Sequence, residues 1–268
     1  MTTTLLTPIA TLIYLSVGAI LAIRLIKGIT SATGKSVLLT LGMAAIILHA
    51  IVLYHYIFMP SGINLGFFNA LSLLSWLIAL LLLIVSISKP VENLGILILP
   101  LAGIALLLEL FFSTDRVLAQ AEAVKLETHI LISILAYSIL SIAAVQAILL
   151  AIQNKQLHDR RPFGFVRALP PLEIMETLLF QMIGLGFFFQ SISLVTGFLF
   201  LEDMFAQHLA HKTVLSITAW IVFATLLWGR WRYGWRGRTA IRWTLGGFAA
   251  LLLAYFGSKL VLEVLLKR

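Results

Sequence analysis

Histidine is the side chain of this sequence best suited to chemistry, because the chain has six histidines and no cysteine. Without cysteine there is no thiol redox chemistry, no Cys-ligated zinc or iron–sulfur cluster, and no covalent haem attachment through C-x-x-C-H. A neutral imidazole can still ligate a metal ion or haem iron. Any metal or cofactor site must therefore be built on histidine or on other non-thiol ligands.

His129 opens an apolar segment in which Ser133, Tyr137 and Ser141 follow at steps of four residues. Side chains four residues apart lie on one face of a helix. In a membrane such a polar stripe should face neighbouring helices, where its hydroxyl groups can form hydrogen bonds. Two interpretations remain open: the stripe is a helix-packing contact with a histidine at the membrane interface, or His129 is a ligand at the mouth of the bundle.

The other histidines give weaker signals for metal binding. His208 and His211 form an H-x-x-H pair that could bind zinc on a helix, or could lie in a solvated loop, because no third and fourth ligand follow in a recognisable pattern. His49 and His55 are six residues apart, which places them on different helix faces. We do not expect His49 and His55 to share a metal, although either could be a single axial ligand.

Three ionisable residues fall at or near membrane depth: Glu109, Lys259 and Glu263. Such residues usually pair with each other or line an aqueous cavity. Lys259 and Glu263 are four residues apart and could neutralise each other, and proton-coupled transport is the alternative interpretation. No Walker loop, G-x-G-x-x-G, H-E-x-x-H or G-x-S-x-G pattern is present, and no nucleophile and base stand at a recognisable spacing. The sequence therefore predicts that the protein is not an enzyme.

The composition places these residues in a membrane. The 268 residues are 61% hydrophobic and 11% charged, with a mean hydropathy of +1.06, whereas soluble domains carry about 25% charged residues. Backbone polar groups in a bilayer must be satisfied internally, so apolar runs of about 20 residues should be helices. We predict an all-α fold, a polytopic transmembrane helical bundle forming a single integral membrane domain over residues 1–268, with about eight spans near 5–26, 37–58, 65–87, 94–112, 129–152, 177–200, 213–229 and 241–264.

The stretch WGRWRYGWRGR at residues 228–238 bears on the orientation of these spans. Lysine and arginine mark cytoplasmic loops, and tryptophan and tyrosine prefer the lipid headgroup layer. With the N-terminus outside, 13 of the 19 lysines and arginines fall on the inner side and five of the six histidines lie toward the outer half. We therefore predict an outside N-terminus, and we interpret this stretch as a contact with membrane lipid rather than with nucleic acid.

Three segments carry a resemblance to a known family: HILISILAYSILSIAAVQAILLAI, METLLFQMIGLGFFFQSISLVTG and AWIVFATLLWGRWRYGWRGRTAIRWTLGGFAALLLAYFGSKLVLE. In order and spacing they resemble the cytochrome c assembly family, the haem-handling membrane proteins of the CcsA, CcmC and HemX type. The chain looks most like the YpjD-type bacterial inner-membrane branch of that family. The resemblance covers about residues 127–264, and G-W-R-G-R and Y-F-G are its most distinctive pieces.

The resemblance implies a multi-pass protein of the bacterial inner membrane that binds haem non-covalently near the outer face and assists cytochrome c-type biogenesis. Haem, membrane lipid and other cytochrome c maturation proteins are the implied partners. His129 matches the first external haem histidine of the family. The second is absent from the C-terminal VLEVLLKR, which leaves four other candidates: His49, His55, His208 and His211. We expect His129 and His211 to ligate haem iron, because His211 lies in the same predicted outer layer.

Other features of the resemblance leave the function more open. Where the synthetase members of the family carry a tryptophan-rich W-G-x-x-W-x-W-D platform, this chain has QHLAHKTVLSITAW. Lys212, Lys125 or Arg116 could pair with haem propionates on the outer side. Two alternative functions are a membrane scaffold or regulator of haem synthesis, acting through basic inner loops, and a small-ion or metal transporter using Glu109, Lys259 and the histidines.

Overall fold

A computed structural model describes residues 2–29, 31–59, 62–112, 117–118, 123–159, 169–200 and 207–257. Within these residues the chain is almost entirely helical, and eight helices are long and apolar enough to cross a membrane. The predicted all-α fold with eight spans is confirmed. The chain divides into two compact units, the N-terminal unit (Met1–Gln120 with Asp159–Pro170) and the C-terminal unit (Ala121–His158 with Pro171–Arg268).

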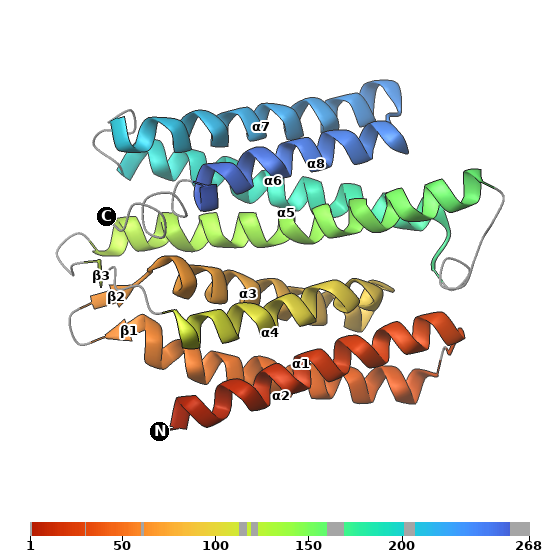
Figure 1. The fold of residues 1–268 in the computed structure, drawn as a ribbon. Coiled ribbons are helices and arrows are strands. Elements are labelled where there is room, and N and C mark those ends of the chain that lie inside the picture. The colour runs from red at the N-terminus through yellow and green to blue at the C-terminus, as the bar shows by residue number, and fades with distance from the viewer. Residues whose placement is uncertain are drawn as a thin grey trace. The chain divides into compact units, whose positions relative to one another are not determined.

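Four long helices form the N-terminal unit: α1 (Thr2–Lys27), α2 (Ala32–Ile57), α3 (Phe67–Ser88) and α4 (Gly95–Phe111). In Figure 1 they run from red to yellow, and the short 3₁₀ helix η1 (Glu92–Leu94) leads into α4. Helix α1 packs against both α2 and α4, and α3 packs against α2 and α4. The α1–α4 contact is close, because a Cβ atom at Gly18 would lie 2.8 Å from Cγ of Pro100.

A small antiparallel sheet stands beside the helices of this unit, and it was not predicted. Its strands are β1 (Phe58–Met59), β2 (Gly62–Asn64) and β3 (Val117–Leu118), with β2 in the middle. The sheet is tied to the start of α3, since Asn69 Nδ2 donates to the carbonyl oxygen of Asn64 at 3.4 Å. Strands of two or three residues are too short to produce a hydrophobic alternation that the sequence could reveal.

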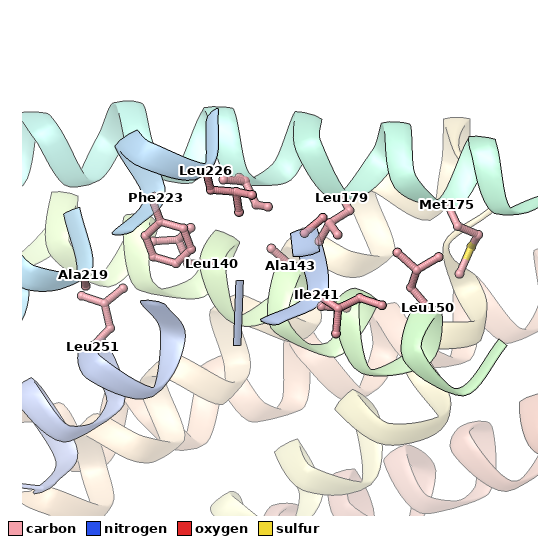
Figure 2. Packing of buried hydrophobic residues seen from close by; sticks show 13 residues of the cluster. Leu140, Ala143, Leu150, Met175, Leu179, Ala219, Phe223, Leu226, Ile241 and Leu251 are labelled. Carbon is pink, nitrogen blue, oxygen red and sulfur yellow. The ribbon is translucent and has the colours of Figure 1, made fainter. Parts of the chain in front are cut away.

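The C-terminal unit contains α5 (Ala123–His158), α6 (Leu172–Phe200), α7 (Gln207–Tyr233) and α8 (Arg238–Leu252), followed by one π-helical turn, η4 (Leu253–Gly257). Helix α5 packs along α6, and α8 packs against α5 and α7. Figure 2 shows the core that these helices share, in which Leu140, Leu179, Phe223 and Leu226 are fully buried. This core fixes the positions of the helix ends that carry the candidate site.

The helix boundaries differ from the predicted ones mainly beyond the apolar segments. Helix α5 begins at Ala123 and ends at His158, whereas the prediction was 129–152. Hydropathy marks only the part suited to lipid, while polar residues such as Gln153 and Lys155 continue the same backbone hydrogen bonding. Helix α6 begins at Leu172 rather than near 177, directly after Pro171, because proline is well tolerated at a helix start. The predicted end of the last span, residue 264, lies outside the described residues.

Basic side chains gather at one end of each unit, as the membrane orientation requires. In the described part of the N-terminal unit, they end α1 and α3 or begin α2: Arg24, Lys27, Lys35 and Lys89. In the C-terminal unit, arginines cluster where α7 ends and α8 begins, and beside them Trp231 is 82% exposed. Such exposure suits a headgroup layer, and the placement of the N-terminus outside stays a prediction.

Candidate functional site

The polar stripe of α5 faces α6. His129 lies half-buried on α5, and its Nδ1 atom is 3.1 Å from Oγ1 of Thr196 on α6. One turn further along, Ser133 Oγ lies 2.7 Å from Ser193 Oγ, also on α6. The expectation that the stripe contacts a neighbouring helix is confirmed. Because the stripe serves helix packing, any chemistry depends on what remains available on the imidazole ring.

Hydroxyl groups around His129 determine which ring nitrogen carries the hydrogen. Thr196 Oγ1 donates its own hydrogen to the carbonyl oxygen of Ser193 at 3.0 Å, so toward His129 Nδ1 it acts as an acceptor. Ser133 Oγ donates to the carbonyl oxygen of His129 at 2.6 Å, so its 3.5 Å approach to Nε2 brings no hydrogen to that atom. With these donor assignments the neutral imidazole would be the Nδ1–H tautomer, and Nε2 would keep its lone pair for another partner.

This arrangement fits the requirements of an axial ligand to haem iron. A metal-ligating histidine usually donates its other ring N–H to an oxygen, which fixes the tautomer and the ring orientation. In this chain Thr196 supplies that oxygen to His129, and Nε2 is the nitrogen left for iron. The donor set at His129 is thus chemically suited to haem.

The same face of α5 leads from the imidazole to an aromatic cluster. Two turns beyond His129, the ring of Tyr137 lies 5.6 Å from that of Phe248 and 5.8 Å from that of Phe256, measured between centroids. The ring of Tyr255 is 6.4 Å from Tyr137. Tyr255 and Phe256 belong to the Y-F-G segment, which forms η4, and single π-helical turns are frequent at functional sites. The cluster therefore joins two segments that the sequence singled out.

His211 lies on α7 at the same end of the C-terminal unit as His129. Two hydrogen bonds set the antiparallel register of α6 and α7, one of them from Trp220 Nε1 to Ser191 Oγ at 2.8 Å, and they bring His211 near the level of Thr196. However, His211 is exposed. It precedes Trp220 by nine residues, which is about two and a half turns of the helix. His211 and Trp220 therefore lie on opposite sides of α7. No hydrogen bond among the described residues joins the two histidines, and their shared ligation of iron stays a prediction.

Two further histidines of the N-terminal unit have different surroundings. His55 is exposed near the end of α2, and its ring lies 5.9 Å from that of Tyr54. His49 is fully buried, with one ring nitrogen 3.3 Å from Tyr14 Oη and the other 2.9 Å from Ser72 Oγ. Because both nitrogens of His49 have partners, we do not count it among the haem ligands.

Several residues named from the sequence lie outside the described part of the structure. They are the side chains of Lys125 and His208 and the whole of Arg116, Lys259 and Glu263. Of the proposed propionate partners, Lys212 lies near the start of α7. This is the same end of the C-terminal unit as His129. Within the described residues no group of three or more His, Cys, Asp or Glu side chains could hold a metal ion.

The three segments that carry the family resemblance contact one another. Gln146 Nε2 of α5 donates to the carbonyl oxygen of Met175 at 3.1 Å, and Met175 begins the second segment. The adjacent Glu176 accepts a 2.8 Å hydrogen bond at Oε1 from the backbone N–H of Gly237, within the G-W-R-G-R run. With the Tyr137 cluster, these contacts link α5, α6, α7 and α8. Sequence spacing alone could not reveal these partners, because the residues of each pair lie 29 and 61 positions apart.

Glycines shape the turn between α7 and α8. Gly234 and Gly237 adopt positive φ angles of 66° and 57°, which residues with a Cβ atom rarely adopt. Arg230 Nη1 donates to the carbonyl oxygen of Trp235 at 3.2 Å, and its guanidinium lies 4.7 Å above the ring of Phe180. The cationic and aromatic residues of the turn are thus part of a defined structure, and their contact with lipid stays a prediction.

Comparison with known proteins finds matches along most of the chain and others along parts of it. The family model described as "Cytochrome C assembly protein" matches residues 37–266. Inner membrane protein YpjD of Escherichia coli (strain K12) is 34% identical over 227 residues, which cover 82% of this chain and 84% of that protein. The cytochrome c biogenesis proteins CcsA of Chlamydomonas reinhardtii and Trichodesmium erythraeum are 27% identical over 139 residues and 28% over 91. These matches cover 50% and 33% of this chain and 38% and 26% of the two proteins.

The eight apolar helices, with basic side chains gathered at one end of each unit, define a multi-pass helical protein of the bacterial inner membrane. The family match extends over most of its length, and the chain belongs to the cytochrome c assembly protein family. The match begins at residue 37, within α2. It therefore includes much of the N-terminal unit as well as residues 127–264, where the sequence resemblance was recognised.

Proposed function

We propose that this protein binds haem non-covalently through His129 and assists cytochrome c-type biogenesis without catalysing a reaction itself. The observation that carries the proposal is the 3.1 Å contact of His129 Nδ1 with Thr196 Oγ1, which favours the Nδ1–H tautomer and leaves Nε2 as the nitrogen for a ligand. Haem supplies an iron atom that accepts an imidazole nitrogen as an axial ligand. Membership of the cytochrome c assembly family, and the name of the CcsA relatives, support this role.

The residues around His129 would act as its supporting partners. Thr196 holds Nδ1–H and so keeps the ring in one orientation, and the Ser133–Ser193 contact joins α5 to α6 directly beside it. We assign the second axial position to His211, which is exposed near the same level of the C-terminal unit. In this proposal the bound haem is received at the outer membrane face and passed to other cytochrome c maturation proteins.

Visible absorption spectra of the full-length protein, purified from haem-replete membranes, test the proposal. We expect a Soret band in the wild type and its loss in His129→Ala, because the ligand atom is removed. Thr196→Val keeps the shape of the side chain but not the acceptor for Nδ1–H, so haem affinity should fall by about 10–100-fold. His158→Ala, an exposed histidine at the far end of the same helix, is the matched control and should bind as the wild type does.

The His211→Ala variant distinguishes single from double ligation. If His211 is the second ligand, its loss should convert the low-spin spectrum of a bis-histidine complex into that of a five-coordinate haem. A wild-type protein without a Soret band after haem loading would refute haem binding altogether. A band that survives in His129→Ala would refute the assigned ligand while leaving family membership untouched.

A further inference from the structure

The N-terminal unit contains a buried chain of polar side chains contributed by all four of its long helices. It begins on α1, where Tyr14 Oη lies 3.3 Å from Nδ1 of His49 on α2. It continues from His49 Nε2 to Ser72 Oγ on α3, a distance of 2.9 Å. Ser72 Oγ then donates to Glu109 Oε2 on α4 at 2.7 Å. These four side chains are at most 1% exposed, and none of them belongs to the proposed haem site.

One oxygen among these four polar side chains lacks a hydrogen-bond partner. Glu109 Oε1 is buried and has no hydrogen-bond partner among the described residues. Thr7 Oγ1 on α1 is buried without a partner in the same way. Helices α1 and α4 are antiparallel, and Thr11 Oγ1 donates to Gly103 O at 3.3 Å. Thr7 lies one turn before Thr11 on α1, and so at a level closer to Glu109 on α4. A buried oxygen without a partner costs more on an ionised carboxylate than on a neutral carboxyl group, which favours a proton at Glu109.

Among the described residues, few charges surround the carboxyl group. Helix α3 has no titratable side chain, and Glu109 is the only one on α4. Of the remaining titratable residues of α1 and α2, three are at the opposite helix ends: Arg24, Lys27 and Lys35. Tyr54 and His55 are exposed. Tyr56 is half-buried beside the small apolar cluster around Val52. In η1, Glu92 pairs with Lys35 at 3.2 Å. A carboxylate beside a neutral imidazole would therefore leave one negative charge buried at membrane depth, which is strongly unfavourable.

We propose that His49 and Glu109 together bind one proton, which Ser72 relays between them. With the proton on the imidazole, Nδ1–H of His49 donates to Tyr14 Oη, and Nε2–H donates to Ser72 Oγ. Ser72 O–H in turn donates to the Glu109 carboxylate. Transfer moves the hydroxyl hydrogen of Ser72 to Glu109 Oε2 while the Nε2 hydrogen moves to Ser72 Oγ. The products are a neutral imidazole and a neutral carboxyl group, so the net charge of the pair is zero before and after.

The two end groups lie at different depths from the same side of the unit. Glu109 stands two residues before α4 ends at Phe111, which is about 3 Å along the helix axis. His49 stands eight residues before α2 ends at Ile57, about 12 Å along the axis. Both ends belong to the side of the unit that carries the β sheet. Glu109 is therefore the end of the polar chain nearer to that side, which is the outer side in the predicted orientation.

Infrared and nitrogen NMR spectra of the full-length protein in lipid vesicles test this site. The bound proton must be seen either as the C=O stretching band of a protonated, dry carboxyl group or as a doubly protonated His49 ring. We expect the carboxyl band, if present, to vanish in Glu109→Gln and to persist in Glu92→Gln, an ion-paired and partly exposed glutamate of the same unit. The doubly protonated ring should likewise be lost in Glu109→Gln and kept in Glu92→Gln.

Ser72→Ala keeps both titratable groups, His49 and Glu109. It therefore tests the relay even if Glu109→Gln does not fold. Removing the hydroxyl should shift the carboxyl band of Glu109, because a 2.7 Å hydrogen bond is lost, and an unshifted band would overturn the relay. A neutral His49 beside an ionised Glu109 in the wild type would overturn the proton site itself. Spectra recorded in sodium and potassium salts must agree, since a sodium-dependent band would assign the site to a metal cation instead.

Discussion

Two adjacent glycines on α8 allow a sharp test of the packing in the C-terminal unit. Gly246 is exposed, and a Cβ atom there would meet nothing within 4 Å. Gly247 is buried, and its Cβ atom would lie 2.9 Å from Cζ of Phe223 and 3.1 Å from both of the ring's Cε atoms. Phe223 is fully buried in the core shown in Figure 2, where neighbouring side chains surround its ring. The two positions therefore differ in the space available while sharing one helix.

We expect alanine at these neighbouring positions to change stability in opposite directions. Each substitution removes the conformational freedom of glycine within a helix, which stabilises by about 0.5–1 kcal/mol. At Gly247 the added methyl group also overpacks the core, which typically costs about 1–3 kcal/mol. Gly246→Ala should therefore raise the free energy of unfolding, and Gly247→Ala should lower it by about 0.5–2 kcal/mol.

Chemical unfolding in detergent micelles measures both variants against the wild type. The double variant Gly247→Ala with Phe223→Leu completes the test, because a smaller side chain opposite the new methyl group should relieve the clash. Relative to Phe223→Leu alone, Gly247→Ala should then cost less or become stabilising. Equal effects at the two glycines, or a penalty unchanged in the double variant, would refute the close contact between α7 and α8.

Three further predictions concern single contacts, all measured in the same micelle assay. Gly237→Ala should destabilise by about 1–3 kcal/mol, because a φ of 57° with a ψ of −131° strains any residue that has a Cβ atom. Gln146→Leu keeps the volume but removes the donor to the carbonyl oxygen of Met175, so a loss of about 1 kcal/mol is expected, and a neutral result would contradict a role for that hydrogen bond. Lys35→Ala breaks a partly exposed ion pair with Glu92 and should cost no more than about 1 kcal/mol, with the difference shrinking in high salt.

Apolar runs predicted the fold well because the bilayer imposes a strong constraint. A segment that must satisfy its own backbone hydrogen bonds and face lipid can be recognised by length and hydropathy alone. The same signal says nothing about polar residues that continue a helix, which is why α5 extends beyond both of its predicted ends. It is also blind to β1, β2 and β3, because strands of two or three residues are too short to show a hydrophobic alternation and β3 pairs with a strand distant in the sequence.

Candidate residues were easier to predict than their partners. The stripe from His129 to Ser141 was visible because its residues recur at the period of a helix. Thr196, which fixes the tautomer of His129, lies 67 residues away and has no local signal. Likewise, His49 and Glu109 each drew notice as polar residues in apolar helices, but their link through Ser72 depends on the packing of α2, α3 and α4.

The segments that carry the family resemblance contain both packing residues and the residues of the proposed chemistry. Gln146, Met175, Glu176 and Gly237 hold the helices of the C-terminal unit together, and Tyr137 packs against the Y-F-G turn. His129 begins the first of these segments and Thr196 lies near the end of the second, so packing and the proposed chemistry share the same stretches of sequence. Thr196→Val preserves the shape of the side chain and removes only the oxygen that contacts His129. It therefore tests the proposed chemistry with little change in the packing of α5 against α6.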